Sequence, residues 1–133
     1  MRPLEKVPAV RRIETDRDDV FAVEIMGEFT SADAENLCGL LEGAFALKED
    51  IDLVAVLSGL ESVDLTDLSS ETASFMRAEV ARHVTRCAVV GDGMWSDRVS
   101  RLFEPRSGAE FRHFLPDDEA HAWQWIGTRP LDQ

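Results

Sequence analysis

Cysteine, long apolar runs and repeats are scarce or absent in this sequence, and each shortage excludes a class of protein. Two cysteines, Cys38 and Cys87, are too few for a disulfide framework or a four-cysteine metal site, and their apolar neighbours predict burial. The longest apolar run, Leu53 to Leu57, is far shorter than the roughly 20 residues of a membrane-spanning helix. The first residues lack the apolar core of a signal peptide, so we expect a cytoplasmic protein without membrane insertion.

Basic residues are also few. The 14 lysines and arginines face 26 aspartates and glutamates, which gives a formal net charge of −12. Such a chain repels phosphate backbones and anionic membrane surfaces, so we expect no nucleic-acid partner. The 133 residues suit one domain over 1–133, with 1–8 as a loose lead-in and 128–133 as a frayed tail.

The first third of the chain predicts an antiparallel hairpin followed by a helix. In residues 20–27, Phe21, Val23 and Ile25 alternate with a second set, and this period of two indicates a strand. Residues 10–15 form a weaker strand before a short polar turn, so the two pair as a hairpin. Thr30 caps the next helix, and Asp33 completes a capping box. The apolar stripe of that helix comprises Leu37, Leu40, Leu41, Ala44 and Phe45.

Strands and helices alternate through the rest of the sequence. The expected elements are strand 51–59, helix 68–84, strand 86–92, helix 94–103 with Pro105 and Gly108 bounding its end, strand 110–115 near an edge, and a helix from Asp117. Strands separated by helices run parallel, because a parallel pair needs a crossover. The fold class is therefore α/β. We expect a single mostly parallel sheet of about five strands, in the order β-β-α-β-α-β-α-β-α, with helices mainly on one face.

The last helix and the second face of the sheet raise the question of a partner. Ala120, Trp123 and Ile126 are expected to point inward. Trp125 lies two residues from Trp123 and cannot share its face, so it points to solvent or to a partner. The other face of the sheet would carry Val20, Ala22 and Met26. If helices cover one side only, this face needs a protein partner, a ligand or a bent helix, and we expect a homodimer or an apolar-ligand groove.

Two segments carry a family resemblance. CAVVGDGMW, residues 87–95, and EAHAWQWI, residues 119–126, resemble the SpoIIAA-like group of STAS-type domains, and the resemblance spans residues 10–127. It implies the superhelical α/β fold that this group shares with CRAL-TRIO lipid-binding domains. It also implies a non-enzymatic binding or regulatory module without a cofactor. The alternative is a carrier of a small apolar or lipid ligand in the manner of CRAL-TRIO domains, which requires an enclosed apolar cavity.

Ser69 and Ser70 allow three interpretations. We favour a helix cap, since a serine at a helix start accepts a backbone hydrogen bond. A regulatory phosphosite is the second, because the resemblance to anti-sigma-factor antagonists places a phosphorylatable serine here. In this sequence Leu68 separates Asp67 from the serine pair, and Glu71 replaces a glycine. A catalytic nucleophile is the third, but the sequence has no Gly-x-Ser-x-Gly elbow, so we predict no catalytic residue.

The turn Gly91-Asp92-Gly93 and Trp95 form the other candidate surface for a ligand or partner, together with Trp125 on the last helix. Ligands in open α/β sheets bind beyond the carboxyl ends of strands, where this turn is expected. The turn is neither a dinucleotide fingerprint nor a P-loop, so we favour a tight turn without cofactor binding. Trp95 either roofs a shallow pocket or staples its helix to the core.

The histidines predict no metal site. They are His83, His113 and His121, and their spacing fits no His-x-x-x-His helix pattern.

Overall fold

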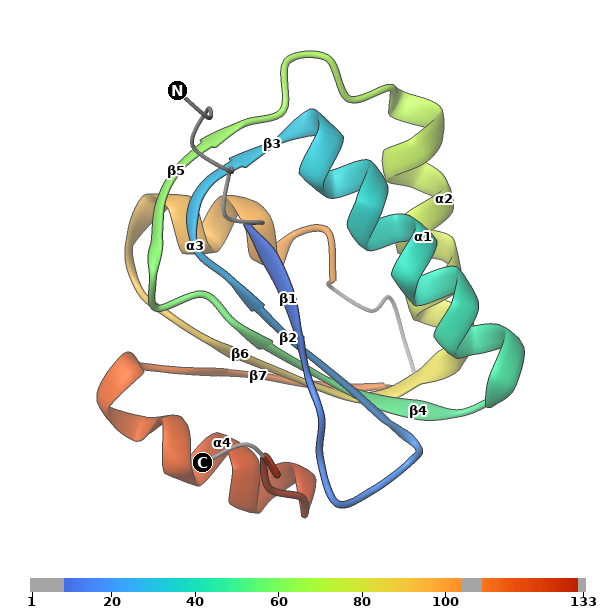
Figure 1. Ribbon diagram of the computed structural model, residues 1–133, viewed down its shortest axis with the longest axis vertical. Coiled ribbons are helices and arrows are strands. Elements are labelled where there is room, and N and C mark those ends of the chain that lie inside the picture. Colours follow the sequence, from blue (N-terminus) through green and yellow to red (C-terminus); the bar gives the residue numbers. More distant parts are fainter. Residues whose placement is uncertain (1–8, 104–108, 132–133) are drawn as a thin grey trace, which may run out of the picture.

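The computed structural model describes residues 9–103 and 109–131 and contains the expected α/β arrangement (Figure 1). The main sheet has the order β1-β2-β4-β6-β7, in which β1 is antiparallel to β2 and the other pairs are parallel. Its strands are β1 (Val10–Ile13), β2 (Val20–Ile25), β4 (Ile51–Val56), β6 (Val84–Val90) and β7 (Glu110–Phe114). The helices are α1 (Ser31–Leu47), α2 (Ser70–His83), α3 (Gly93–Ser100), a 3-10 turn η1 (Pro116–Asp118) and α4 (Glu119–Ile126). The predicted fold class and opening hairpin are confirmed.

The inner face of the sheet packs against α1, α2 and α3 and holds the larger core. Alternate strand residues, among them Phe21, Val23 and Leu53, are fully buried there. The matching helix residues are Leu37, Leu41, Phe45, Met76, Val80 and Val99. This packing confirms the predicted apolar stripe of α1, because a surface helix buries one face and leaves the other to solvent.

The outer face of the sheet is covered by α4, which lies alone on that side (Figure 1). Ala122, Trp123 and Ile126 are buried against outward residues of β2, β4 and β6. Ala120 is exposed, so its predicted inward position is wrong. The buried face of α4 contains Ala122 in its place. Since α4 covers this face, the sheet does not need a partner to bury it. The homodimer expected from an open sheet face therefore loses its main argument.

A second, two-stranded sheet was not predicted. It pairs β3 (Gly27–Thr30) in parallel with β5 (Leu60–Asp64). The sequence predicted one strand through residue 27 and a loop after residue 59. The chain instead ends β2 at Ile25 and leaves Met26 36% exposed beside Gly59. Gly27 has a φ of +66°, which reorients the chain into β3.

Helix α1 begins as predicted. Thr30 accepts a hydrogen bond from the Asp33 amide, and the Asp33 carboxylate accepts one from the Thr30 amide (2.9 Å). The helix also carries Gly39 and Gly43 on exposed positions. A Cβ built on either glycine meets nothing within 4 Å, so internal packing does not require them.

Arg17 joins the hairpin, the central strand and α4. Its guanidinium donates to both carboxylate oxygens of Asp19 (2.9 Å each), to Asp52 (3.0 Å) and to the carbonyl of Ile126 (2.7 Å). Asp52, on β4, is 8% exposed and also accepts from the Thr85 hydroxyl (2.7 Å). A buried carboxylate needs such partners, because an unpaired one would cost several kcal/mol.

The segment after α4 is bonded to the β1–β2 turn, which corrects part of the expected frayed tail. The hydroxyl of Thr128 donates to Asp16 (2.5 Å), and the Leu131 amide donates to the carbonyl of Glu14 (2.8 Å). Thr15 and Pro130 form an isolated antiparallel bridge. The expected lead-in 1–8, the helix-bounding Pro105 and Gly108, and the end of the tail, 132–133, lie outside the described residues.

The glycines of α1 give a stability prediction. Gly39→Ala and Gly43→Ala should each raise the free energy of unfolding by about 0.5–1 kcal/mol, because alanine loses less backbone entropy in a helix. Gly91→Ala should lower it, since its Cβ would lie 2.6 Å from the Ser96 hydroxyl. Urea denaturation measures all three, and a destabilised Gly39→Ala protein would contradict the open surroundings described above.

The Arg17 network gives a pH prediction. Hydrogen bonding from Arg17 holds the pKa of Asp19 below its ordinary value of 3.8. A carboxyl whose pKa is lower in the folded chain stabilises it above the unfolded pKa, and this contribution is lost as the pH falls through the folded value. Wild-type protein should therefore lose more stability on acidification than Asp19→Asn, in denaturant titrations from neutral to acidic pH. Equal slopes for the two proteins would refute the role given to this ion pair.

Candidate functional site

Ser69 and Ser70 lie at the N-terminus of α2, as the sequence predicted. Ser69 is the cap: its hydroxyl oxygen accepts from the Thr72 amide (3.1 Å) and donates to the Thr72 hydroxyl (2.8 Å). Ser70 is exposed, and its hydroxyl makes no hydrogen bond within the described part of the chain. The favoured cap interpretation is thus confirmed for Ser69, while Ser70 offers a hydroxyl that the fold does not use.

The geometry around this serine pair lacks a base. His83 lies at the opposite end of α2, about 20 Å along the helix axis. Its Nδ1 donates to the carbonyl of Glu49 (2.6 Å), and its ring stacks on Phe45 at 4.6 Å. A serine nucleophile requires a base within hydrogen-bonding reach. In the described part of the chain, neither the Ser69 nor the Ser70 hydroxyl is hydrogen-bonded to such a base.

The Gly91–Trp95 turn follows β6 at the carboxyl end of the main sheet. Gly91 is buried and donates its amide to the carbonyl of Phe114 (2.9 Å), while Gly93 has a φ of +85°. Asp92 is exposed and makes no side-chain cap to α3. Trp95 is half-buried and packs against the inner core, which agrees with the interpretation that it fastens its helix to the core.

Trp125 lies on the other side of the sheet and does not join that turn. It packs against the outer core, with its ring 6.1 Å from Phe114. The guanidinium groups of Arg86 and Arg112 lie 5.3 and 5.4 Å from the same ring, within cation–π range. The predicted ligand or partner surface is therefore divided between two faces, and these arginines partly cover the tryptophan.

The histidines do not converge. Nε2 of His113 donates to the carbonyl of Gly91 (2.8 Å), and His121 is exposed with Nδ1 3.5 Å from the carboxylate of Asp118. Within residues 9–103 and 109–131, no group of three histidine, cysteine or carboxylate side chains is placed to hold a metal ion. The same residues contain no helix long and apolar enough to cross a membrane.

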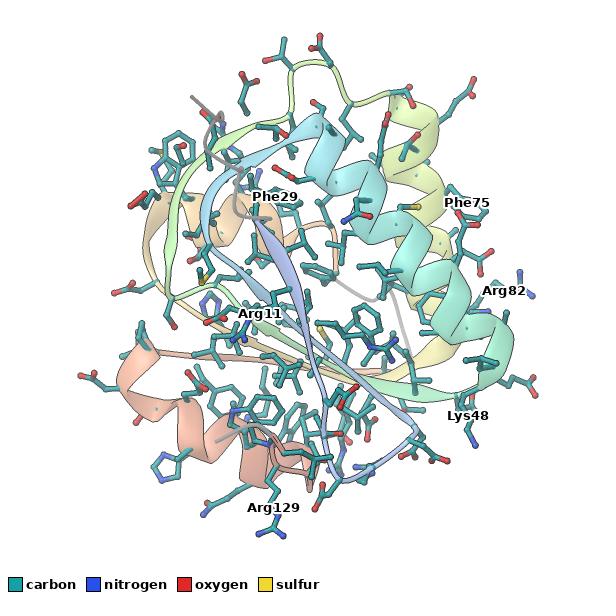
Figure 2. All side chains as sticks on the ribbon, in the orientation of Figure 1. Arg11, Phe29, Lys48, Phe75, Arg82 and Arg129 are labelled. Carbon is teal, nitrogen blue, oxygen red and sulfur yellow. The ribbon has the colours of Figure 1, made fainter. Side chains whose placement is uncertain are left out.

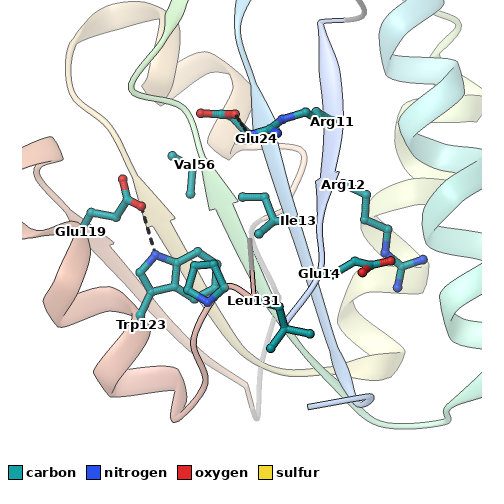
Figure 3. Close-up of a pocket in the computed structure, with 10 residues that line it drawn as sticks. Arg11, Arg12, Ile13, Glu14, Glu24, Val56, Glu119, Trp123 and Leu131 are labelled. Carbon is teal, nitrogen blue, oxygen red and sulfur yellow. Dashed lines mark hydrogen bonds and ion pairs between the residues drawn. The ribbon is translucent and has the colours of Figure 1, made fainter. Parts of the chain in front are cut away.

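A cleft between β1, α4 and the segment after α4 was not predicted (Figure 3). It has a volume of about 520 Å³, and Ile13, Val56, Trp123 and Leu131 supply its apolar lining. Some of its charged groups have partners in the lining. Arg11 bonds to Glu24 (2.7 Å) and the Trp123 indole donates to Glu119 (3.1 Å). The cleft thus combines charged side chains, some of them paired, with a small apolar floor.

A groove between α1 and α2 was also not predicted. We call it the α1–α2 groove; it has a volume of about 500 Å³ and is lined by Glu35, Cys38, Gly39, Glu42, Glu71, Thr72 and Phe75. Phe75 is 43% exposed, although it is next in sequence to the buried Met76 of α2 (Figure 2). The groove starts at the turn that Ser69 caps, since Glu71 and Thr72 form its end.

Comparison with known proteins settles the family. The sequence profile of the SpoIIAA-like family matches residues 20–127. The chain belongs to the SpoIIAA-like family. It is similar in structure to an uncharacterized protein from the DUF3478 family of Shewanella loihica PV-4 with a SpoIIAA-like fold. The two are 24% identical with a TM-score of 0.64, over 94% of this chain and 99% of the other. No curated protein matched the sequence.

Both cysteines of this SpoIIAA-like chain are buried and reduced, as predicted. Burial and the neighbouring carboxylate of Glu42 raise the pKa of Cys38, and burial raises the pKa of Cys87. A raised pKa keeps a thiol protonated and unreactive. Cys38 lines the α1–α2 groove as a thiol that donates to the carboxylate of Glu42 (3.7 Å).

The serine pair gives a prediction that separates its two members. Ser69→Ala should lower the free energy of unfolding by about 1 kcal/mol, because it removes the cap of α2. Ser70→Ala should change it by less than about 0.5 kcal/mol, as expected for an exposed side chain without partners. Chemical denaturation of both variants measures this difference. Equal losses of unfolding free energy in the two variants would contradict the assignment of Ser69 as the cap of α2.

Proposed function

We propose that this chain is a non-enzymatic binding or regulatory module, with Ser70, beside the cap residue Ser69, as its regulatory phosphosite. The observation that carries the proposal is the exposed Ser70 hydroxyl in the first turn of α2, where it makes no bond within the described residues. A kinase can reach such a hydroxyl without unfolding the helix. The positive end of the helix dipole favours a phosphate there.

The acidic surroundings of the serine pair repel an added phosphate, so phosphorylation would disturb the local arrangement. Asp64, Asp67 and Glu71 are exposed near the serine pair. The Asp67 amide donates to the hydroxyl of Ser31 (3.1 Å), which ties the loop to the start of α1. Added negative charge would therefore act on the first turns of both helices, where a partner protein would sense it.

Two other functions receive less support. The α4 cleft is lined largely by charged side chains, which suits neither an enclosed apolar cavity nor a lipid. An enzyme of the serine-nucleophile type would need a base near Ser69, and the nearest bonds of that hydroxyl are to Thr72. Binding without chemistry is the function that this arrangement supports best.

The proposal predicts a phosphate on α2. Protein isolated from its source cells under several growth conditions should carry one phosphate in the peptide 49–77, located to Ser70 or its neighbour Ser69 by fragmentation mass spectrometry. The Ser69→Ala/Ser70→Ala double variant should lose it. Ser74→Ala, an exposed serine further along the same helix, should retain it.

Two outcomes would overturn this proposal. One is an unmodified peptide under every growth condition; the other is a phosphate that persists in the double variant. Native mass spectrometry of the same preparations checks the carrier alternative, because bound lipid would appear as mass beyond that of the protein and phosphate.

A further inference from the structure

The α1–α2 groove combines an apolar floor with an exposed aromatic side chain. Phe75 stands at one wall and projects from α2 to the outside of the molecule (Figure 2). Beneath it, Leu41, Phe45 and Met76 are buried, and they line a narrow extension of the groove. An exposed aromatic above such a floor is a typical anchor point for a protein partner.

The glycines of α1 point to close approach by another backbone. Gly39 lines the groove and Gly43 lies one turn further along the same exposed side of α1. Each weakens the helix relative to alanine, yet neither has a positive φ nor a neighbour that a Cβ would touch. The folded chain therefore gives no reason for them. A partner segment that lies directly on α1 supplies one, because small residues let two helices approach closely.

The charge on the groove selects the partner. Glu35, Glu42 and Glu71 line it, and α1 contains no basic residue between Ser31 and Leu47. Glu42 accepts from the neutral Cys38 thiol (3.7 Å), which leaves its charge in place, whereas Glu79, outside this lining, is paired with Arg82 (3.8 Å) and His83 (3.2 Å). A second copy of this chain, with its net charge of −12, would meet the same sign of charge at this surface. A basic segment would meet the opposite sign.

From these observations we propose that the α1–α2 groove docks a basic amphipathic helix of a partner protein. The apolar side of that helix lies on Phe75 and the glycine surface, and its lysines or arginines face the three glutamates. This is the helix-in-groove mode, in which apolar residues at i, i+3, i+4 and i+7 supply the anchors. The inference rests on the proposed binding role, for which it names the class of partner, and it does not depend on the phosphosite.

The test is a titration of the full chain into a fluorescein-labelled Leu/Lys peptide of about 18 residues, designed as an amphipathic helix. Fluorescence anisotropy should show saturable binding that weakens as salt is added. A scrambled peptide of the same composition, and a Leu/Glu peptide of the same pattern, should bind at least about tenfold more weakly.

Matched variants locate the binding. Phe75→Ser and Gly39→Leu should each weaken binding at least about tenfold, whereas Met94→Ser, which removes an exposed apolar side chain on α3, should leave it unchanged. The triple change Glu35→Gln, Glu42→Gln and Glu71→Gln should weaken binding more than Glu28→Gln, Glu61→Gln and Asp97→Asn, which remove three exposed acids elsewhere. Circular dichroism and urea denaturation confirm that each variant is folded.

Equal affinity for the scrambled peptide would show that net charge alone attracts it and would overturn the inference. Equal effects of Phe75→Ser and Met94→Ser, or no binding by the Leu/Lys peptide, would overturn it as well. Any of these results with the α2 phosphate present would leave the proposed regulatory role standing. A missing phosphate with groove-specific peptide binding would refute the phosphosite alone.

Discussion

The central strand β4 is buried on both faces, and this constraint organises the rest of the chain. All six of its residues are buried, one of them Asp52. A strand of this kind needs a helix layer on each side, so α1 and α2 cover one face and α4 the other. The buried carboxylate needs a cation, and Arg17 supplies it while also holding the carbonyl at the end of α4. One arginine therefore ties the cover of the outer face to the strand beneath it.

Because both faces of the sheet are covered, the proposed partner would have to contact the outer surfaces of helices or the loops between them. The groove between α1 and α2 forms where the two helices lie side by side over the inner core. The cleft beside α4 lies between that short helix and β1, and its lining is largely charged, with Arg11 and Glu24 paired. The α1–α2 groove has the exposed ring of Phe75 at its wall, whereas the cleft has only a small apolar floor beside its charged side chains. This contrast favours binding of a protein segment over storage of a small apolar ligand.

Most of the fold was predictable because its signals are local. The alternation in residues 20–25, the capping box of Thr30 and Asp33, and the continuous apolar run of β4 each depend on neighbours in sequence. The pairing of β3 with β5 was not predictable in this way. Their segments, GEFT and LESVD, bury only Phe29 and Val63, and each strand is defined by a partner some thirty residues away. The bonds from Asp16 to Thr128 are missed for the same reason, since a polar turn and a polar tail carry no mark of their contact.

The α1–α2 groove could be predicted from the sequence even less than the fold could. In the sequence, two glycines four residues apart inside a helix indicate only a weaker helix. They become informative when the structure shows that nothing in the folded chain occupies the space above them. Phe75 is similar, because a phenylalanine in a helix is usually buried, and only the structure shows that its ring is 43% exposed. The proposed docking surface is therefore inferred from residues that lower the stability of the chain and that no internal contact explains. Such residues can be identified only once the internal contacts of each residue are known.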